Sequence, residues 1–165
     1  MTEYLLVHAL GNALNLPLDM HGIAVIDFQQ SGNAGIYPAL AEGFGIPWHM
    51  VTDGDQEAAK FRQQILDRGF AEDGLAGKFT TLPQDRDLED QLLADGHERL
   101  LREIMGTVGG QSALTCPFDE FTKRLKNKKT GYMGTLSLRI AADKDLAVKM
   151  PAPFVDLIKS LGGVA

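Results

Sequence analysis

The chain alternates between helical patterns and compact apolar runs, and this alternation restricts its fold more than any other feature. GIAVIDF (22–28) and WHMVT (48–52) are short runs of large apolar residues, as in strands that are buried on both faces. A helical pattern covers 56–69, and a further short run, KFTTLP (78–83), follows it. Helices that alternate with strands in this way are typical of a parallel sheet covered by helices. The sequence therefore predicts an α/β fold in which a parallel sheet is flanked by helices.

Further helices are expected around these strands. Apolar residues at helical spacing predict a helix over 2–15 and another over 36–45. An amphipathic pattern over 87–106 predicts a helix that breaks at Gly96. The segment QQSGNAG (29–35) is expected to form a Gly-rich turn, and the C-terminal part is expected to be mostly helical, with a Gly-bearing turn ahead of GTLSLRIAADK.

The length and composition fit one soluble globular domain. We divide its 165 residues into a core over 1–110 and a mostly helical C-terminal extension over 111–165. A single cysteine, Cys116, excludes an internal disulfide framework and indicates a reducing cytoplasm. No apolar run is long enough for a membrane span. The net charge of −6 argues against broad binding to nucleic acid, although KRLKNKK (123–129) holds five of the sixteen Lys and Arg residues.

Two carboxylates, Asp53 and Asp55, follow the apolar run 48–52 with only Gly54 between them. Like charges this close raise each other's pKa unless a cation or solvent relieves them. An Asp-Gly turn whose second Asp caps the next helix explains the pair. A site for Mg²⁺ or Mn²⁺ explains it equally well, because these ions prefer hard oxygen ligands. Ligands bind at the carboxyl ends of parallel strands, and this position favours the metal interpretation.

Other candidate residues have an ordinary structural explanation. Glu3 lies in the first turn of a predicted helix, where a negative charge is favourable, and Glu89 fits a solvated helix face. The basic run 123–129 also fits a solvated face, although phosphoryl chemistry at two metals often uses one lysine to offset transition-state charge. We expect packing for Cys116. Structural roles are expected for the histidines, His8, His21, His49 and His97.

Four segments of the chain together resemble the TOPRIM domain of OLD-family nucleases. In order they are MTEYLLVHAL, GIAVIDFQQSGN, YPALAEGFGIPWHMVTDGD and DLEDQLL. TOPRIM is the metal-binding α/β module that topoisomerases, primases and these nucleases share. The resemblance covers about residues 1–140, which is far more specific than a lone Asp-x-Asp. It implies a TOPRIM-like parallel sheet flanked by helices, with 1–110 as the metal-binding core.

The resemblance also implies roles for individual acidic residues. Thr2-Glu3 matches the last two positions of the family's Glu-Gly-x-Ser/Thr-Glu motif, and Asp53 and Asp55 match its Asp-x-Asp. Glu89 matches a further acidic residue, for which Asp87 and Asp90 are near alternatives. The implied metal ligands are Glu3, Asp53, Asp55 and Glu89.

A lysine of the basic run completes the implied catalytic group. Lys128 or Lys129 matches a family lysine that approaches the scissile phosphate. The implied catalytic residues are Glu3, Asp53, Asp55, Lys128 and Lys129. By this resemblance the protein is a Mg²⁺- or Mn²⁺-dependent endonuclease that hydrolyses DNA with two ions. The ions would also relieve the repulsion between the two aspartates and invert the local field, so that an acidic chain can bind DNA.

Two parts of the family pattern have no counterpart ahead of Met1. They are the first strand with its glutamate, and the ATPase domain that precedes TOPRIM. A fragment with an open sheet edge, a tendency to oligomerise and weak or no activity alone is therefore expected. The alternative is an inactive, truncated TOPRIM module that binds DNA or a partner. A haloacid dehalogenase-type phosphatase or a nucleotide-sugar glycosyltransferase also uses Asp-x-Asp, but DGDQEA lacks the Thr or Val of the phosphatase pattern.

Overall fold

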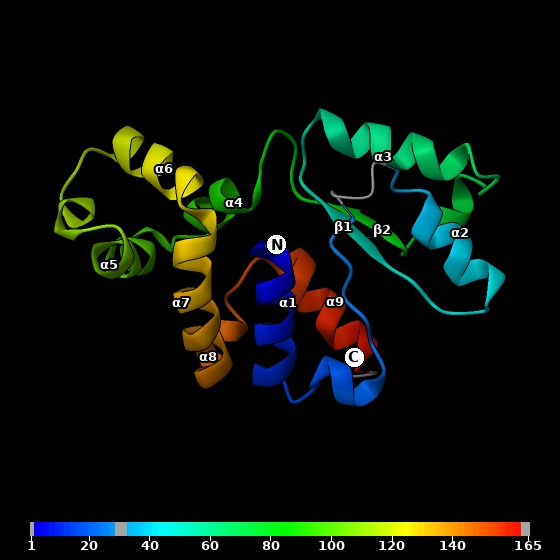
Figure 1. Ribbon diagram of the computed structural model, residues 1–165, viewed down its shortest axis with the longest axis horizontal. Helices are drawn as coiled ribbons and strands as arrows, with labels where there is room; N and C mark the ends of the chain where they lie inside the picture. Colours follow the sequence, from blue (N-terminus) through cyan, green and yellow to red (C-terminus); the bar gives the residue numbers. More distant parts are fainter. Residues whose placement is uncertain (1, 29–32, 163–165) are drawn as a thin grey trace. The chain divides into compact units, whose positions relative to one another are not determined.

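The protein forms two compact units, which we describe separately. The computed structural model describes residues 2–28 and 33–162 (Figure 1). One unit, here called the sheet unit, comprises residues 27–88. The other, here called the helical unit, comprises residues 1–26 and 89–165. The division predicted from the sequence, into a core over 1–110 and an extension over 111–165, remains a prediction.

The sheet unit contains a small parallel sheet. Its strands are β1 (Met50–Thr52) and β2 (Phe79–Thr81), and Met50 lies opposite Phe79. The runs predicted as strands over 48–52 and 78–83 thus form shorter strands, and their parallel pairing is confirmed.

Helices cover this sheet in the way that the alternation predicts. In the sheet unit these are α2 (Ile36–Gly43), α3 (Gln56–Leu66) and a short 3-10 helix, η3 (Asp73–Leu75). Met50 packs with Ile65 of α3 and with Leu75 in a core that aromatic rings enclose. Two aromatic pairs in this core meet edge to face, Phe28 with Phe61 and Trp48 with Phe70. This geometry is favourable for aromatic quadrupoles and fixes the packing of the small core.

The helical unit is built around a helix pair that is distant in sequence. Helix α1 (Thr2–Ala13) lies beside α7 (Lys129–Ala142), and α9 (Ala152–Leu161) also packs on α1 (Figure 1). Leu6 and Leu10 of α1 are fully buried, as is Leu136 of α7. The remaining elements of this unit are η1 (Leu18–His21), α4 (Leu88–Ala94), α5 (Glu98–Val108), η4 (Gln111–Leu114), α6 (Phe118–Asn127) and α8 (Lys144–Ala147).

Several sequence-based predictions are confirmed in this unit. The break at Gly96 separates α4 from α5, and Gly96 has a φ of 87°, which favours glycine. The C-terminal part is mostly helical, as expected. In its described part the protein is mostly helical with a small parallel sheet, so the α/β prediction is confirmed in this coarse form. None of the described helices is long and apolar enough to span a membrane.

The strand predicted over 22–28 is not found, because residues 23–27 have neither helix nor strand structure. A strand exists only through hydrogen bonds to a neighbouring strand, and the described sheet consists of β1 and β2 alone. Ile26, at the end of this run, is more than half exposed instead of buried. The turn predicted over 29–35 lies partly outside the residues that the structure describes, which resume at residue 33.

The Gly-bearing turn predicted ahead of GTLSLRIAADK is also wrong. Helix α7 runs without interruption from Lys129 through Gly131 and Gly134. Each glycine costs a helix about 1 kcal/mol relative to alanine. Burial of Tyr132 and Met133 between the two glycines offsets this cost, because both side chains have no exposed surface.

We predict that Leu136→Ala destabilises the helical unit by about 2–5 kcal/mol, because Leu136 is fully buried in the packing of α7. Leu138→Ala is the matched control, since Leu138 lies on the same helix and is 74% exposed. Its effect should stay within about 0.5 kcal/mol. Urea unfolding followed by circular dichroism measures both changes. Equal losses for the two variants would contradict the packing described for α7.

Candidate functional site

The acidic pair lies at the carboxyl end of β1, where the sequence places it. Strand β1 ends at Thr52, and α3 begins directly after Asp55. A carboxylate oxygen of Asp55 (Oδ1) accepts a hydrogen bond of 2.9 Å from the backbone N–H of Glu57. Asp55 is thus the N-cap of α3, which is the structural role that its position indicated. Its second carboxylate oxygen is not used by this cap and can bind a ligand.

The glycine between the aspartates allows the ends of the two strands to touch. The N–H of Gly54 donates to the carbonyl of Arg86 at 2.8 Å, and the carbonyl of Gly54 accepts from the N–H of Asp85 at 2.8 Å. A Cβ on Gly54 would lie 1.9 Å from the carbonyl oxygen of Pro83. Only glycine fits so close to another backbone. The aspartates therefore project from a loop whose backbone is fixed on both sides of Gly54.

A shallow pocket opens beside this loop. It has a volume of about 400 Å³ and lies between α3 and β2. Its lining is formed by Gly54, Asp55, Ala58, Ala59, Arg62, Phe79, Thr81, Leu82 and Gln84. Next to the acidic pair, Thr52 is 7% exposed, and its hydroxyl has no hydrogen-bond partner among the residues that the structure describes. Buried hydroxyls without a partner are uncommon, and this one lies at the strand end where ligands bind.

A second group of the predicted residues meets in the helical unit. Glu89 of α4 is fully buried, so the interpretation as a solvated helix face is wrong for this residue. The hydroxyl of Tyr132 donates to its Oε1 at 2.6 Å. The ammonium of Lys129 lies 2.8 Å from Oε2, in an ion pair that does not meet hydrogen-bond geometry. Both partners come from α7, and they neutralise and orient a carboxylate that would otherwise be costly to bury.

Neighbouring residues are more exposed. Asp90, one alternative to Glu89, forms an ion pair of 2.8 Å with Lys126 of α6. Lys128 is exposed at the junction between α6 and α7. Glu3 is half-buried in the first turn of α1, where its charge is favourable for the helix dipole.

The structure thus places the predicted site residues in two groups. Asp53 and Asp55 belong to the sheet unit, whereas Glu3, Glu89, Lys128 and Lys129 belong to the helical unit. Over 2–28 and 33–162, no three His, Cys, Asp or Glu side chains are gathered in a way that could hold a metal ion. The chemistry of the acidic pair nevertheless fits one hard divalent cation, because Mg²⁺ commonly keeps several waters and takes one or two carboxylates from the protein.

Tyr132 is a residue of this site that sequence reasoning missed. Its spacing of three from Lys129 places both side chains on one face of a helix. That signal depends on a continuous helix over 129–142, whereas the two glycines indicated a turn.

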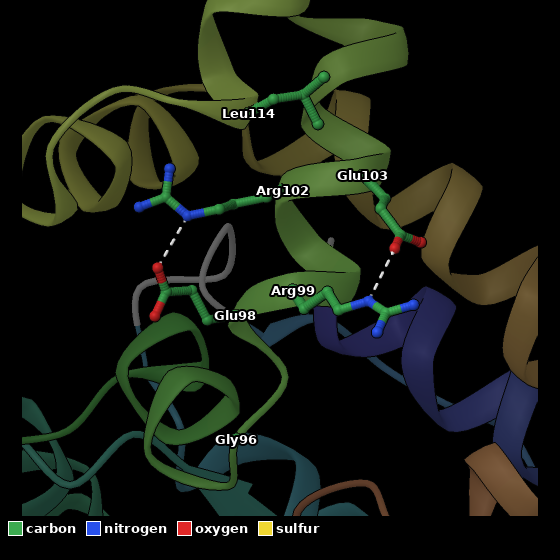
Figure 2. Close-up of a pocket in the computed structure, with 6 residues that line it drawn as sticks. All are labelled: Gly96, Glu98, Arg99, Arg102, Glu103 and Leu114. Carbon is green, nitrogen blue, oxygen red and sulfur yellow. Dashed lines mark hydrogen bonds and ion pairs between the residues drawn. The ribbon is translucent and has the colours of Figure 1, made fainter.

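Another pocket, of about 450 Å³, lies along α5 and is lined by paired charges (Figure 2). Arg102 pairs with Glu98 at 2.7 Å, and Arg99 pairs with Glu103 at 3.1 Å. The guanidinium of Arg102 also donates to the carbonyl of Cys116 at 3.0 Å, and it stacks on an aromatic ring of α6. These contacts hold η4 and the following residues against α5, which is a structural role.

Comparison with protein families supports the resemblance for the first part of the chain. Residues 1–55 match the family model described as overcoming lysogenization defect protein-like, TOPRIM domain. The match spans a third of the 165 residues. It includes Glu3, Asp53 and Asp55 and ends before Glu89 and Lys129. No curated protein and no solved structure matches the chain.

We predict that Gly54→Ala lowers the stability of the sheet unit by about 1–3 kcal/mol, because the added Cβ would overlap the backbone of the β2 exit. Fluorescence of Trp48, the one tryptophan, reports unfolding of this unit, and amide exchange over 79–88 reports opening of the loop. Gly43→Ala is the control, since no atom lies within 4 Å of its added Cβ. Unchanged exchange over 79–88 in Gly54→Ala would contradict the close approach.

We also predict that the sheet unit loses stability below about pH 6.5 through His49. Burial lowers the pKa of His49 from its usual value, while the Gly77 backbone opposes this in part. The unfolded chain therefore binds a proton at a higher pH than the folded unit. The neutral ring makes its full contribution to the stability of the folded unit above the pKa of His49 in the unfolded chain, near 6.5. This contribution is lost as the pH falls toward the lowered pKa of the folded unit. Urea unfolding followed by Trp48 fluorescence gives the free energy of unfolding at pH 7.5 and at pH 5.0. This free energy should differ less between the two pH values in His49→Gln than in the unchanged protein.

Proposed function

We propose that this protein is a divalent-metal-dependent nuclease module that hydrolyses phosphodiester bonds in DNA. The observation that carries the proposal is the acidic pair at the end of β1, held by the Gly54 contacts and lying within the matched residues. The match indicates a metal-binding module of the nuclease or primase type. The finer activity, an endonuclease of the OLD family that uses Mg²⁺ or Mn²⁺ in the cytoplasm, is our inference from the resemblance.

In this proposal Asp53 and Asp55 would hold one divalent ion. The resemblance also assigns Glu3 and Glu89 to the ligand set, but both belong to the helical unit, where Glu89 is buried and paired with Lys129 and Tyr132. A bound ion would activate a water and stabilise the departing oxygen. The protein contributes hard oxygen ligands, a fixed loop geometry and a lysine from 128–129 that offsets charge at the phosphate.

The charge of the sheet unit supports a need for the ion. Residues 27–88 contain ten acidic and five basic residues, so that most of the net charge of −6 lies there. A DNA strand would be repelled from this surface unless a cation reversed the local field. DNA binding near the acidic pair should therefore require the divalent ion.

A module that binds DNA or a partner without cutting is the second candidate. The pairing of Glu89 with Lys129 and Tyr132 favours it, because this acidic residue is already neutralised within the protein. Such a module need not take up two ions, so a metal titration distinguishes the two functions.

We predict that Asp53→Asn and Asp55→Asn each weaken Mn²⁺ binding by at least about tenfold, since removal of even an outer-shell partner can cost that much. Mn²⁺-dependent nicking of supercoiled plasmid should be lost in both. Asparagine is as good an N-cap as aspartate, so Asp55→Asn should keep α3 intact. Calorimetry measures the binding, and circular dichroism checks the fold.

The matched control is Asp73→Asn, which removes one exposed carboxylate of η3 from the same unit. It should leave Mn²⁺ binding and nicking unchanged. Mn²⁺ affinity that is equal in all three variants and in the unchanged protein would exclude a metal site at the acidic pair. Tight binding without cleavage would favour the non-catalytic module.

A further inference from the structure

The pocket beside the acidic loop belongs entirely to the sheet unit, and most of its lining has no role in the proposed metal site. It lies between α3 and β2, and its lining residues all fall within 27–88. Its volume of about 400 Å³ is within the range of small-ligand sites, which is roughly 300–1,000 Å³. The side chains of this lining therefore indicate which ligand it could take.

One wall of the pocket is a contact between a guanidinium group and an aromatic ring. The guanidinium of Arg62 lies 5.8 Å from the centre of the Phe79 ring, as in a cation–π contact. Its Nε donates to Glu72 at 3.1 Å, and this bond lies in the plane of the guanidinium. The bond therefore fixes the direction of the group and leaves its flat faces for stacking. Beside this wall, Ala58 and Ala59 of α3 contribute only methyl groups.

Polar groups surround the apolar wall. Thr81 and Gln84 line the pocket and are exposed, and a hydroxyl and an amide can each donate and accept hydrogen bonds. Thr52 is paired with Thr81 in the parallel sheet, so that its side chain projects from the same face. Its buried hydroxyl has no hydrogen-bond partner in the part of the chain that the structure describes. This lining suits a flat ring whose edge carries donors and acceptors.

Charge decides which part of a nucleotide the pocket can accept. Its lining holds one carboxylate, Asp55, and one cation, Arg62, which is already paired with Glu72. The whole unit has ten acidic and five basic residues, so a phosphate would be repelled. An uncharged base is not repelled, and unstacked bases bind proteins by stacking on aromatic rings and guanidinium groups.

We propose that this pocket binds one unstacked nucleobase of a DNA strand, with the ring against Arg62 and Phe79 and the edge toward Thr81 and Gln84. Bases inside a duplex are covered by their neighbours, so the pocket requires a single strand or a base that has left the helix. The DNA origin of the base rests on the proposed function, whereas the binding of the base does not. The substrate class is thus unpaired DNA.

Nuclear magnetic resonance of the ¹⁵N-labelled full chain, in EDTA, tests the binding of the base. Deoxyadenosine supplies a base without phosphate, and 2-deoxyribose 5-phosphate supplies a phosphate without a base. We expect deoxyadenosine to shift the amide signals of Ala58, Ala59 and Gln84, because a stacked ring changes the local magnetic field, and the sugar phosphate to leave them unchanged. No shift with deoxyadenosine, or equal shifts with both compounds, would overturn the proposal.

Two substitutions locate the binding. Ala59→Leu fills the pocket with a side chain that a helix tolerates well, so it should abolish the shifts at Ala58 and Gln84. Ala71→Leu is the matched control, since Ala71 is exposed in the same unit and outside the lining, and it should keep them. Arg62→Lys keeps the charge but loses the flat group, so deoxyadenosine should bind at least about fivefold more weakly.

Unchanged affinity in Ala59→Leu and Arg62→Lys would place the base elsewhere and contradict the proposal. Should Ala59→Leu fail to fold by circular dichroism, Arg62→Lys provides the comparison, because it keeps the charge that pairs with Glu72.

A second titration distinguishes DNA from a free nucleoside as the source of the base. With Mg²⁺ present, a single-stranded DNA octamer should shift the same amide signals, and a blunt duplex of the same sequence should not. Shifts with deoxyadenosine but not with the single strand would overturn the assignment to DNA. The first titration contains no divalent ion, so its result is independent of metal binding and cleavage, and failure of the proposed nuclease function is seen separately in the nicking assay.

Discussion

The backbone contact at Gly54 is the interaction on which the sheet unit depends. A two-stranded sheet with three residues in each strand has too few hydrogen bonds to be stable alone. The bonds of Gly54 to Asp85 and Arg86 extend the connection between the strands beyond the ladder. Helix α3 then begins directly after its N-cap Asp55, so the same loop fixes the sheet and the start of the helix and carries both aspartates. Stability and the candidate site therefore share one short segment.

The helical unit links stability and chemistry in a different way. There the shared element is a buried charge, Glu89, which connects α4 to α7 through Tyr132 and Lys129. Burial of a carboxylate is unfavourable unless its partners are in place, so removal of one partner costs more than the pair contributes. The more exposed ion pair of Asp90 with Lys126, on the neighbouring helix face, is expected to contribute little. The buried group is thus a structural connection between α4 and α7.

The sequence was informative where local pattern and tertiary structure agree. Both strands of the sheet, the N-cap at Asp55 and the break at Gly96 follow from signals within a few residues. The predicted strand 22–28 failed because strand formation depends on a partner elsewhere in the chain, which an apolar run cannot reveal. Burial of Glu89 was equally inaccessible, since a charge next to polar residues resembles a solvated face until the covering helix is known. Tyr132 was missed because the glycines on either side of it indicated a turn. The helix continues through them because burial of side chains between the two glycines offsets their cost, and this burial is not visible in the sequence.

The order of the units along the chain has a consequence for synthesis on the ribosome. The sheet unit, 27–88, is continuous in sequence and can fold as soon as it has emerged. Helix α1 is made before it but packs on α7, whose residues are made more than a hundred positions later. Closing so long a loop is slow, and the apolar face of α1 with Leu6 and Leu10 stays without its final cover during that time. Helix α1 is therefore synthesised before the sheet unit but reaches its native packing after it, and a nascent chain would need protection there.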